Sequence, residues 1–203
     1  MIQLDDAGWG CLIGGVFIGA YRPETEEFCY GEIPVSCFQG EAFARQEYLD
    51  EGARVVQRLF TDLAVPKAEP VQVCTGYVLG GIRQWLSREG YHWYPAKITG
   101  PLQVLVETAL LQTLQRHGLE VDYVTLTEKQ GLLFWECLRW LKGGNINATR
   151  ALPEREKLAK TGWGTYSIWV ENPYAVAKQK AAAFKAARRR ARWKSWEMLY
   201  DTG

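Results

Sequence analysis

The chain has 203 residues, 47% hydrophobic, 13% aromatic and 23% charged, a composition that excludes a disordered or collagen-like protein and predicts one domain with an extension or two small domains. Its net charge of +1 indicates no acidic partner, but residues 151–203 carry 11 Lys and Arg against 5 Asp and Glu (+6), whereas residues 1–150 carry 13 against 18 (−5). Such an asymmetry is typical of proteins that contact nucleic acid or a membrane.

The first part of the chain predicts three strands and a helix. The stretch 2–21 is apolar and glycine-rich, and within it Val16-Phe17-Ile18 reads as a buried strand. A polar loop at 22–27 leads to a third strand at 28–35. Strands joined by short turns are normally antiparallel, so two consecutive hairpins are expected. Apolar residues then recur at helical spacing over 42–63.

The next part alternates strands with helices. The expected elements are a strand at 71–78, a helix at 80–88, a strand at 91–98 and a helix at 101–117. Gly90 and Gly118 follow the two helices as C-terminal caps, and Pro101 opens the second. A strand reached through a helical crossover lies parallel to its neighbour. The pattern therefore predicts a mixed five-stranded sheet covered by helices.

The last third is predicted in less detail. A short strand is expected at 121–126, followed by a helix from Thr127 to Leu141 in which Gln130 completes a capping box. Residues 146–170 have no assigned structure, and Asn172-Pro173 opens a long helix over 173–200. We therefore predict an α/β domain over 1–145 and a basic helical extension over 146–203.

The β-β-β-α-β-α-β-α order resembles the ribonuclease H-like fold, and the first strand adds a local resemblance. Residues 5–16, Asp-Asp-Ala-Gly-Trp-Gly-Cys-Leu-Ile-Gly-Gly-Val, are similar to the opening motif of type 2 ribonucleases H, which reads Asp-Glu-Ala-Gly-Arg-Gly followed by small residues and Gly-Pro-Val. The positions that fit directly are Asp5, Ala7, Gly8, Gly10, Gly14 and Val16, and Asp6 is a conservative match.

The resemblance implies a nuclease site in which carboxylates hold two divalent ions, Mg²⁺ or Mn²⁺, for phosphodiester cleavage. Asp5 matches the central carboxylate of the first strand, and Asp6 matches the position usually held by Glu. Gly8 and Gly10 match the glycines whose backbone approaches the nucleic-acid strand.

Two departures weaken the implied chemistry. Trp9 replaces the arginine of the family, which removes a phosphate or sugar contact. The fourth strand, where the family has another aspartate, carries no acid, and its Cys74 is a soft thiol that suits a hard ion poorly.

The periods of a strand and of a helix indicate on which face of its element each candidate acid lies. Asp5 and Asp6 are adjacent, so they point to opposite faces of the strand and at most one enters a given site. Glu107 falls among leucines on the apolar side of the helix at 101–117, where a carboxylate needs a partner. The resemblance implies that this helix contributes a carboxylate opposite Asp5, which makes Glu107 a candidate metal ligand; the alternative is a boundary ion pair.

Other charged residues are weaker candidates. Three acids of the helix at 42–63 are expected to be solvated, with Glu51 closest to the apolar edge, and Glu32 is an alternative on the third strand. Lys97 and Arg83 could balance buried acids or contact phosphate.

The predicted C-terminal helix concentrates the basic residues. Its candidate nucleic-acid contacts are Lys185, Arg188, Arg189 and Arg192, interleaved with Trp193 and Trp196. Basic residues follow a phosphate backbone and aromatic rings stack on bases. The alternative is a solvated helix that packs its alanine side on the acidic body.

The five cysteines form no CxxC pair and lie mostly in apolar runs, so we expect buried thiols in a reducing cytoplasm and no zinc site. No run of 18 apolar residues and no signal-peptide pattern occur, which predicts a cytoplasmic protein without a membrane span.

Three functions follow from these patterns. The first is a ribonuclease H-like protein that acts on nucleic acid as a metal-dependent nuclease through Asp5, Asp6 and Glu107. The second is a catalytically inactive module of the same fold that binds nucleic acid. The third is an assembly protein whose oligomer interface is lined by tryptophans, namely Trp135, Trp140, Trp163 and Trp169.

Overall fold

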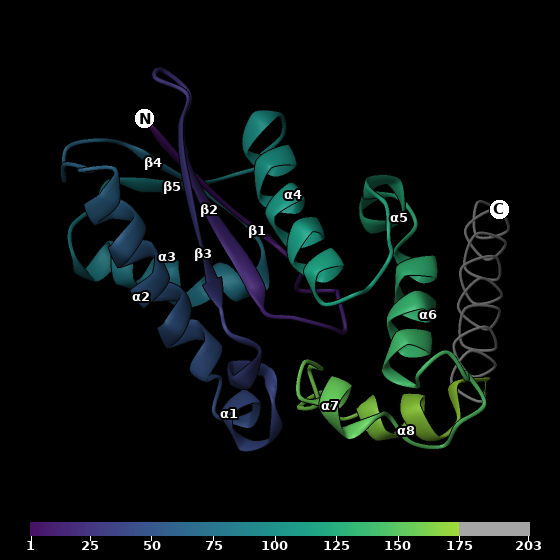
Figure 1. The fold of residues 1–203 in the computed structure, drawn as a ribbon. Coiled ribbons are helices and arrows are strands. Elements are labelled where there is room, and N and C mark those ends of the chain that lie inside the picture. The colour runs from purple at the N-terminus through teal and green to yellow at the C-terminus, as the bar shows by residue number, and fades with distance from the viewer. Residues whose placement is uncertain (175–203) are drawn as a thin grey trace, which may run out of the picture.

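A computed structural model of the chain describes residues 1–174, which fold around a mixed sheet (Figure 1). In this part of the chain five strands pair in the order β3-β2-β1-β4-β5. They are β1 (Ile2–Ala7), β2 (Val16–Arg22), β3 (Glu27–Ile33), β4 (Val71–Cys74) and β5 (Trp93–Ala96). The strand β1 pairs antiparallel with β2 and parallel with β4, and β5 pairs parallel with β4. The predicted hairpins, crossovers and five-stranded mixed sheet are therefore confirmed.

Helices lie on both faces of this sheet. The longer ones are α2 (Glu47–Asp62), α3 (Gly80–Arg88), α4 (Pro101–Arg116) and α6 (Gln130–Leu141). The shorter ones are η1 (Val35–Phe38), α1 (Gly40–Ala44), η2 (Tyr77–Leu79), α5 (Tyr123–Thr127), α7 (Pro153–Glu156) and α8 (Tyr166–Glu171). In Figure 1, α2 and α3 lie on one face, α4 lies on the other, and α5 to α8 continue from the α4 side.

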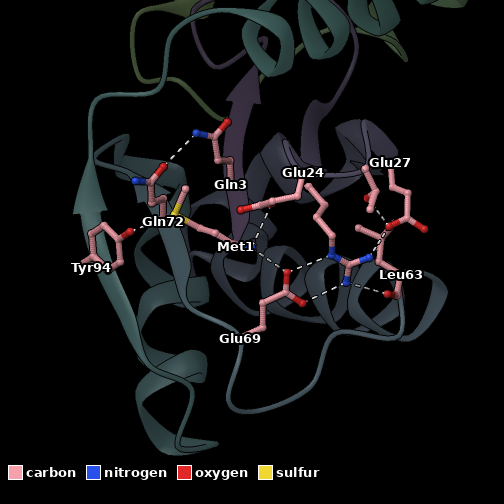
Figure 2. Close-up of polar contacts among 10 residues, drawn as sticks. Met1, Gln3, Glu24, Glu27, Leu63, Glu69, Gln72 and Tyr94 are labelled. Carbon is pink, nitrogen blue, oxygen red and sulfur yellow. Dashed lines mark hydrogen bonds and ion pairs between the residues drawn. The ribbon is translucent and has the colours of Figure 1, made fainter.

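The alternation of side chains along the central strands separates two different faces. Ile2 and Leu4 of β1, with Val71 and Val73 of β4, are buried in one apolar cluster with α2 and α3. The intervening residues point toward α4. They include Gln3 and Gln72, whose side-chain amides form a 2.9 Å hydrogen bond (Figure 2). The sheet therefore has one apolar face and one face that keeps polar side chains.

A second apolar cluster joins α4 and α6 to the segment that follows them. Ala151, Ala159 and Tyr166 are buried in it together with residues of α4 and α6, and the four tryptophans 135, 140, 163 and 169 also pack there. Residues 158–160 lie along the loop after β1, because Gly14 N–H donates to the Leu158 carbonyl and Lys160 N–H donates to the Leu12 carbonyl. Residues beyond the predicted domain boundary at 145 thus contribute to the core around the start of the chain.

At the N-terminal end of β1, an ionic network closes the sheet. The Arg22 guanidinium donates two hydrogen bonds to the Glu69 carboxylate, at 2.9 and 3.0 Å, and a third to the Leu63 carbonyl. The Glu69 carboxylate also contacts the Met1 ammonium at 3.0 Å (Figure 2). The charged groups at this end of the sheet are therefore paired with one another. The candidate acids Asp5 and Asp6 lie toward the other end of β1.

The short strand predicted at 121–126 is wrong. The Asp122 carboxylate accepts a 2.7 Å hydrogen bond from Thr125 N–H and caps α5, so the segment enters a helix. The next helix begins at Gln130 rather than Thr127, and its N-cap Lys129 makes no side-chain capping bond, so the predicted capping box is wrong as well.

Two further elements are shorter than predicted. The helix expected over 42–63 is divided into α1 and α2, because Gln46 adopts a left-handed conformation with φ of +58°. The strand expected over 71–78 ends at Cys74, where the Arg83 guanidinium bonds the Cys74 and Gly76 carbonyls and turns the chain into η2.

The helix predicted over 173–200 falls almost entirely outside the described residues. Within residues 1–174, no helix combines the length and the apolar character needed to cross a membrane.

Candidate functional site

Asp5 lies on the central strand, and its side chain points toward α4. The residue is 7% exposed, and its carboxylate accepts a 2.9 Å hydrogen bond from Asp6 N–H and another from the Cys74 thiol on β4. Burial raises the pKa of Asp5, these two hydrogen bonds oppose the rise, and the negative charge of Glu107 adds to it. Asp5 is thus a buried acid whose charged form is disfavoured unless a cation or a donor approaches.

Glu107 lies on α4, close enough for its charge to act on Asp5. It is half-buried, and its carboxylate accepts hydrogen bonds from the Tyr123 hydroxyl at 2.5 Å and from Gln103 Nε2 at 3.1 Å. The bond to Glu107 raises the pKa of Tyr123 to about 12. Tyr123 was missed in the sequence because its segment reads as a strand, whereas the structure gives it the first turn of α5.

Asp6 lies on the opposite face of β1, as the alternation of a strand requires. One carboxylate oxygen lies only 2.5 Å from where a Cβ on Gly76 would stand, so the turn after β4 closes directly over Asp6. Burial, and next the charge of Asp5, raise the pKa of Asp6 to about 7, against the opposing effect of Lys160 and Arg83. Asp6 is therefore close to half protonated at neutral pH and does not share a ligand set with Asp5.

Lys160 is a second residue near the candidate site that the sequence did not reveal. Its side chain is fully buried, and its ammonium donates a hydrogen bond to the Gly8 carbonyl. Gly8 has φ of +103°, a conformation that L side chains rarely adopt, and this turns its carbonyl toward the lysine. Burial lowers the pKa of Lys160 to about 8, so the group remains largely charged at neutral pH. No local pattern marks a lysine that becomes buried 152 residues away from its partner.

A cavity of about 350 Å³ opens beside these groups. It is lined by the loop after β1, by α4 and by the α5–α6 region, and its polar lining includes Asp6, Gly8, Gly10 and Glu107. The predicted acids Asp6 and Glu107 and the predicted glycines therefore line one cavity, whereas the buried Asp5 is not part of its lining.

Trp9 stands at the position of the arginine in type 2 ribonucleases H. It packs in a group of aromatic rings whose exposure to solvent increases from Tyr48 to Tyr77. Its ring centroid lies 5.5 Å from that of Tyr48 and 5.6 Å from that of Tyr77. Tyr48 is buried at 2% exposure, Trp9 is half-buried, and Tyr77 is 58% exposed, with its hydroxyl accepting a 3.2 Å hydrogen bond from Gln46. We call Trp9 and Tyr77 the aromatic platform, because the Trp9 ring packs on the buried Tyr48 and the Tyr77 ring is exposed to solvent.

The residues do not fit the two-ion set that the resemblance implies. Asp5 and Asp6 point to opposite faces of β1, although Asp6 and Glu107 both line the cavity, and the neighbouring position of β4 holds the soft thiol of Cys74. Across residues 1–174, no group of three or more His, Cys, Asp or Glu side chains is placed to hold a metal ion.

The weaker candidates have structural partners. Glu51 pairs with Arg54 and Arg58, and Glu32 accepts a 3.1 Å hydrogen bond from Gly15 N–H. Arg83 fixes the turn after β4, as its two carbonyl contacts require. The predicted contacts Lys185, Arg188, Arg189 and Arg192 lie outside the described residues.

Comparison with protein-family models and with curated protein sequences found no match to this chain.

Proposed function

We propose that the chain is a ribonuclease H-like protein that binds nucleic acid and lacks two-ion cleavage chemistry. One observation carries this function: the motif from Asp5 to Gly10 sits at the end of the central strand, in a chain whose strands and long helices follow the ribonuclease H-like order. The acid-free β4 is the reason for proposing binding rather than cleavage.

The aromatic platform supports the choice of ligand. Tyr77 presents an open ring next to the loop whose glycines match the nucleic-acid contacts of the family, and Trp9 lies between that ring and the cavity. Stacking of a base on an aromatic side chain contributes about 1–3 kcal/mol and needs no particular sequence. Replacing arginine with Trp9 thus exchanges a phosphate contact for a base contact, which favours an unpaired strand.

The test is a binding titration with the full chain. We expect a fluorescently labelled single strand of RNA or DNA to bind with an affinity that falls as salt rises. Tyr77→Ala should weaken binding about tenfold, as the loss of one stacked base predicts. Tyr30→Ala is the matched control, because Tyr30 is also exposed, at 46%, but lies on the edge strand β3. Absence of binding to RNA, DNA, hybrid and junction would overturn the proposal.

A second candidate is cleavage with a single divalent ion, Mg²⁺ or Mn²⁺, and the position of Glu107 opposite Asp5 favours it. It predicts metal-dependent cleavage of one of the same substrates and its loss in Asp5→Asn and Glu107→Gln. Binding without cleavage in either metal would exclude it and leave the first function standing.

A further inference from the structure

Two cysteines far apart in the sequence meet in the interior. Cys11, in the loop after β1, and Cys137, on α6, have their sulfur atoms 3.8 Å apart, although 126 positions separate them. Both are buried and both are free thiols. Contact between sulfur atoms is what a disulfide requires before the bond can form, and here it joins the loop of the candidate site to a helix of the second apolar cluster.

A buried cation makes this pair different from the other cysteines. Hydrogen bonding by Cys137 lowers the pKa of Cys11 and the Lys160 ammonium adds to that effect, whereas burial opposes it. Burial instead raises the pKa of Cys29 to about 11, and it also raises the pKa of Cys37 and of Cys74. The thiolate is the reactive form of cysteine, so Cys11 is the reactive thiol of the set.

The cavity supplies a route for a small oxidant. Cys11 is one of the residues that line it, next to Gly10, and the Cys137 sulfur lies 3.8 Å from that of Cys11. Hydrogen peroxide is small compared with a space of about 350 Å³, so the cavity can hold it beside Cys11.

We propose that Cys11 and Cys137 form a peroxide-sensitive dithiol that closes to an intramolecular disulfide. The Cys11 thiolate attacks the O–O bond of a peroxide, becomes sulfenic acid and releases hydroxide. The Cys137 thiol then attacks the sulfenic sulfur, the S–S bond forms, and the oxygen leaves as water. Two thiols are oxidised and one hydrogen peroxide is reduced to two waters, so the step is balanced.

The disulfide would change the candidate site through the loop. It ties the segment that follows Gly8 and Gly10 to α6, and it removes the thiolate that faces Lys160. We therefore expect the oxidised protein to have a more rigid loop and a higher melting temperature than the reduced protein.

The experiment treats the full, folded chain with hydrogen peroxide, unfolds it, alkylates the remaining thiols and maps the peptides by mass spectrometry. A cross-linked peptide containing Cys11 and Cys137 is expected, with the loss of two of the five thiols. Cys11 should oxidise faster than Cys29, because Cys11 lines the cavity and has Cys137 in contact with it, whereas burial raises the pKa of Cys29. This readout needs no variant, so it does not depend on whether a substitution folds.

Variants sharpen the result. Cys137→Ser should abolish the cross-link and leave Cys11 as sulfenic acid, which a dimedone probe detects. Cys29→Ser is the matched control and should cross-link like the wild type. Retention of all five thiols in the treated protein, or a cross-link that joins another pair, would overturn the proposal.

Discussion

The two faces of the sheet are built from the same strands but carry different chemistry. Toward α2 and α3, β1 and β4 present Ile2, Leu4, Val71 and Val73, all fully buried. Toward α4, alternate positions of the same strands hold Gln3, Asp5, Gln72 and Cys74. Burying a polar group costs free energy unless it is hydrogen-bonded, and here Gln3 bonds Gln72 while Asp5 accepts bonds from Asp6 N–H and Cys74. One face therefore consists of apolar packing, and the other holds the candidate site on a network of hydrogen bonds.

The largest loss of stability is expected from a substitution at the contact between α2 and α3, where there is no space for an added side chain. A Cβ on Gly81 would stand 2.2 Å from the Leu49 carbonyl oxygen, so α2 and α3 are in contact through backbone. Gly81→Ala should lower the free energy of unfolding by about 3 kcal/mol, measured by urea denaturation, because the helices must separate.

The neighbouring glycine is the matched control. A Cβ on Gly80 would meet its nearest atom, Leu49 Cδ2, at 3.7 Å, which is ordinary contact. Gly80→Ala should therefore leave stability nearly unchanged, and equal losses in the two variants would show that the helix contact is not the cause.

A smaller loss of stability is expected on the α4 face, where Cys74→Asp would place a second carboxylate beside Asp5. Without metal, the variant should lose about 2 kcal/mol, because two neighbouring carboxylates disfavour each other's charge. Mn²⁺ should then raise its melting temperature more than that of the wild type, since an ion that binds only the folded state stabilises it.

Cys74→Asn separates charge from size in that experiment, because it adds a polar side chain without a carboxylate. It should show no added response to Mn²⁺. If wild type and Cys74→Asp respond equally to the ion, the thiol on β4 is not what limits metal binding.

The smallest change in stability is expected from a substitution of Asp6, the acid on the otherwise apolar face, and it depends on pH. Its folded pKa, about 7, lies above the ordinary value of 3.8, so the folded state holds the proton more tightly and this contribution to stability falls as pH rises from about 4 to about 7. Asp6→Asn should therefore leave stability unchanged at pH 4 and raise it at pH 8.5. One pKa unit corresponds to about 1.4 kcal/mol, and partial solvent contact reduces the gain, so we expect about 1 kcal/mol.

Asp122 gives a control of opposite sign for thermal melts at the two pH values. Its hydrogen bond from Thr125 lowers its pKa, so its contribution is present at high pH and is lost as pH falls through the folded pKa. Asp122→Asn should not stabilise the protein at pH 8.5. A gain in both variants would indicate a general effect of net charge.

Strand alternation and helical period in the sequence predicted which face of its element a side chain occupies. Strand alternation placed Asp5 and Asp6 on opposite faces of β1, and the helical period placed Glu107 near the apolar side of its helix, where it is half-buried. The segment at 121–126 was misassigned because a short apolar run suits a strand or a helix, and the capping carboxylate of Asp122 decides between them. Lys160 could not be found, because its burial depends on a contact with Gly8 that no spacing encodes.

That same contact has a consequence for how the molecule is made. The backbone of Gly8, Leu12 and Gly14 is hydrogen-bonded to residues 158–160, and ribosomes add about 5–20 residues per second. The loop is thus synthesised roughly 7–30 seconds before these partners. The sheet and the apolar face can assemble in that interval from contacts within the first hundred residues. We therefore expect the candidate site to be the last region to mature during translation, and the one most exposed to chaperones and proteases on the nascent chain.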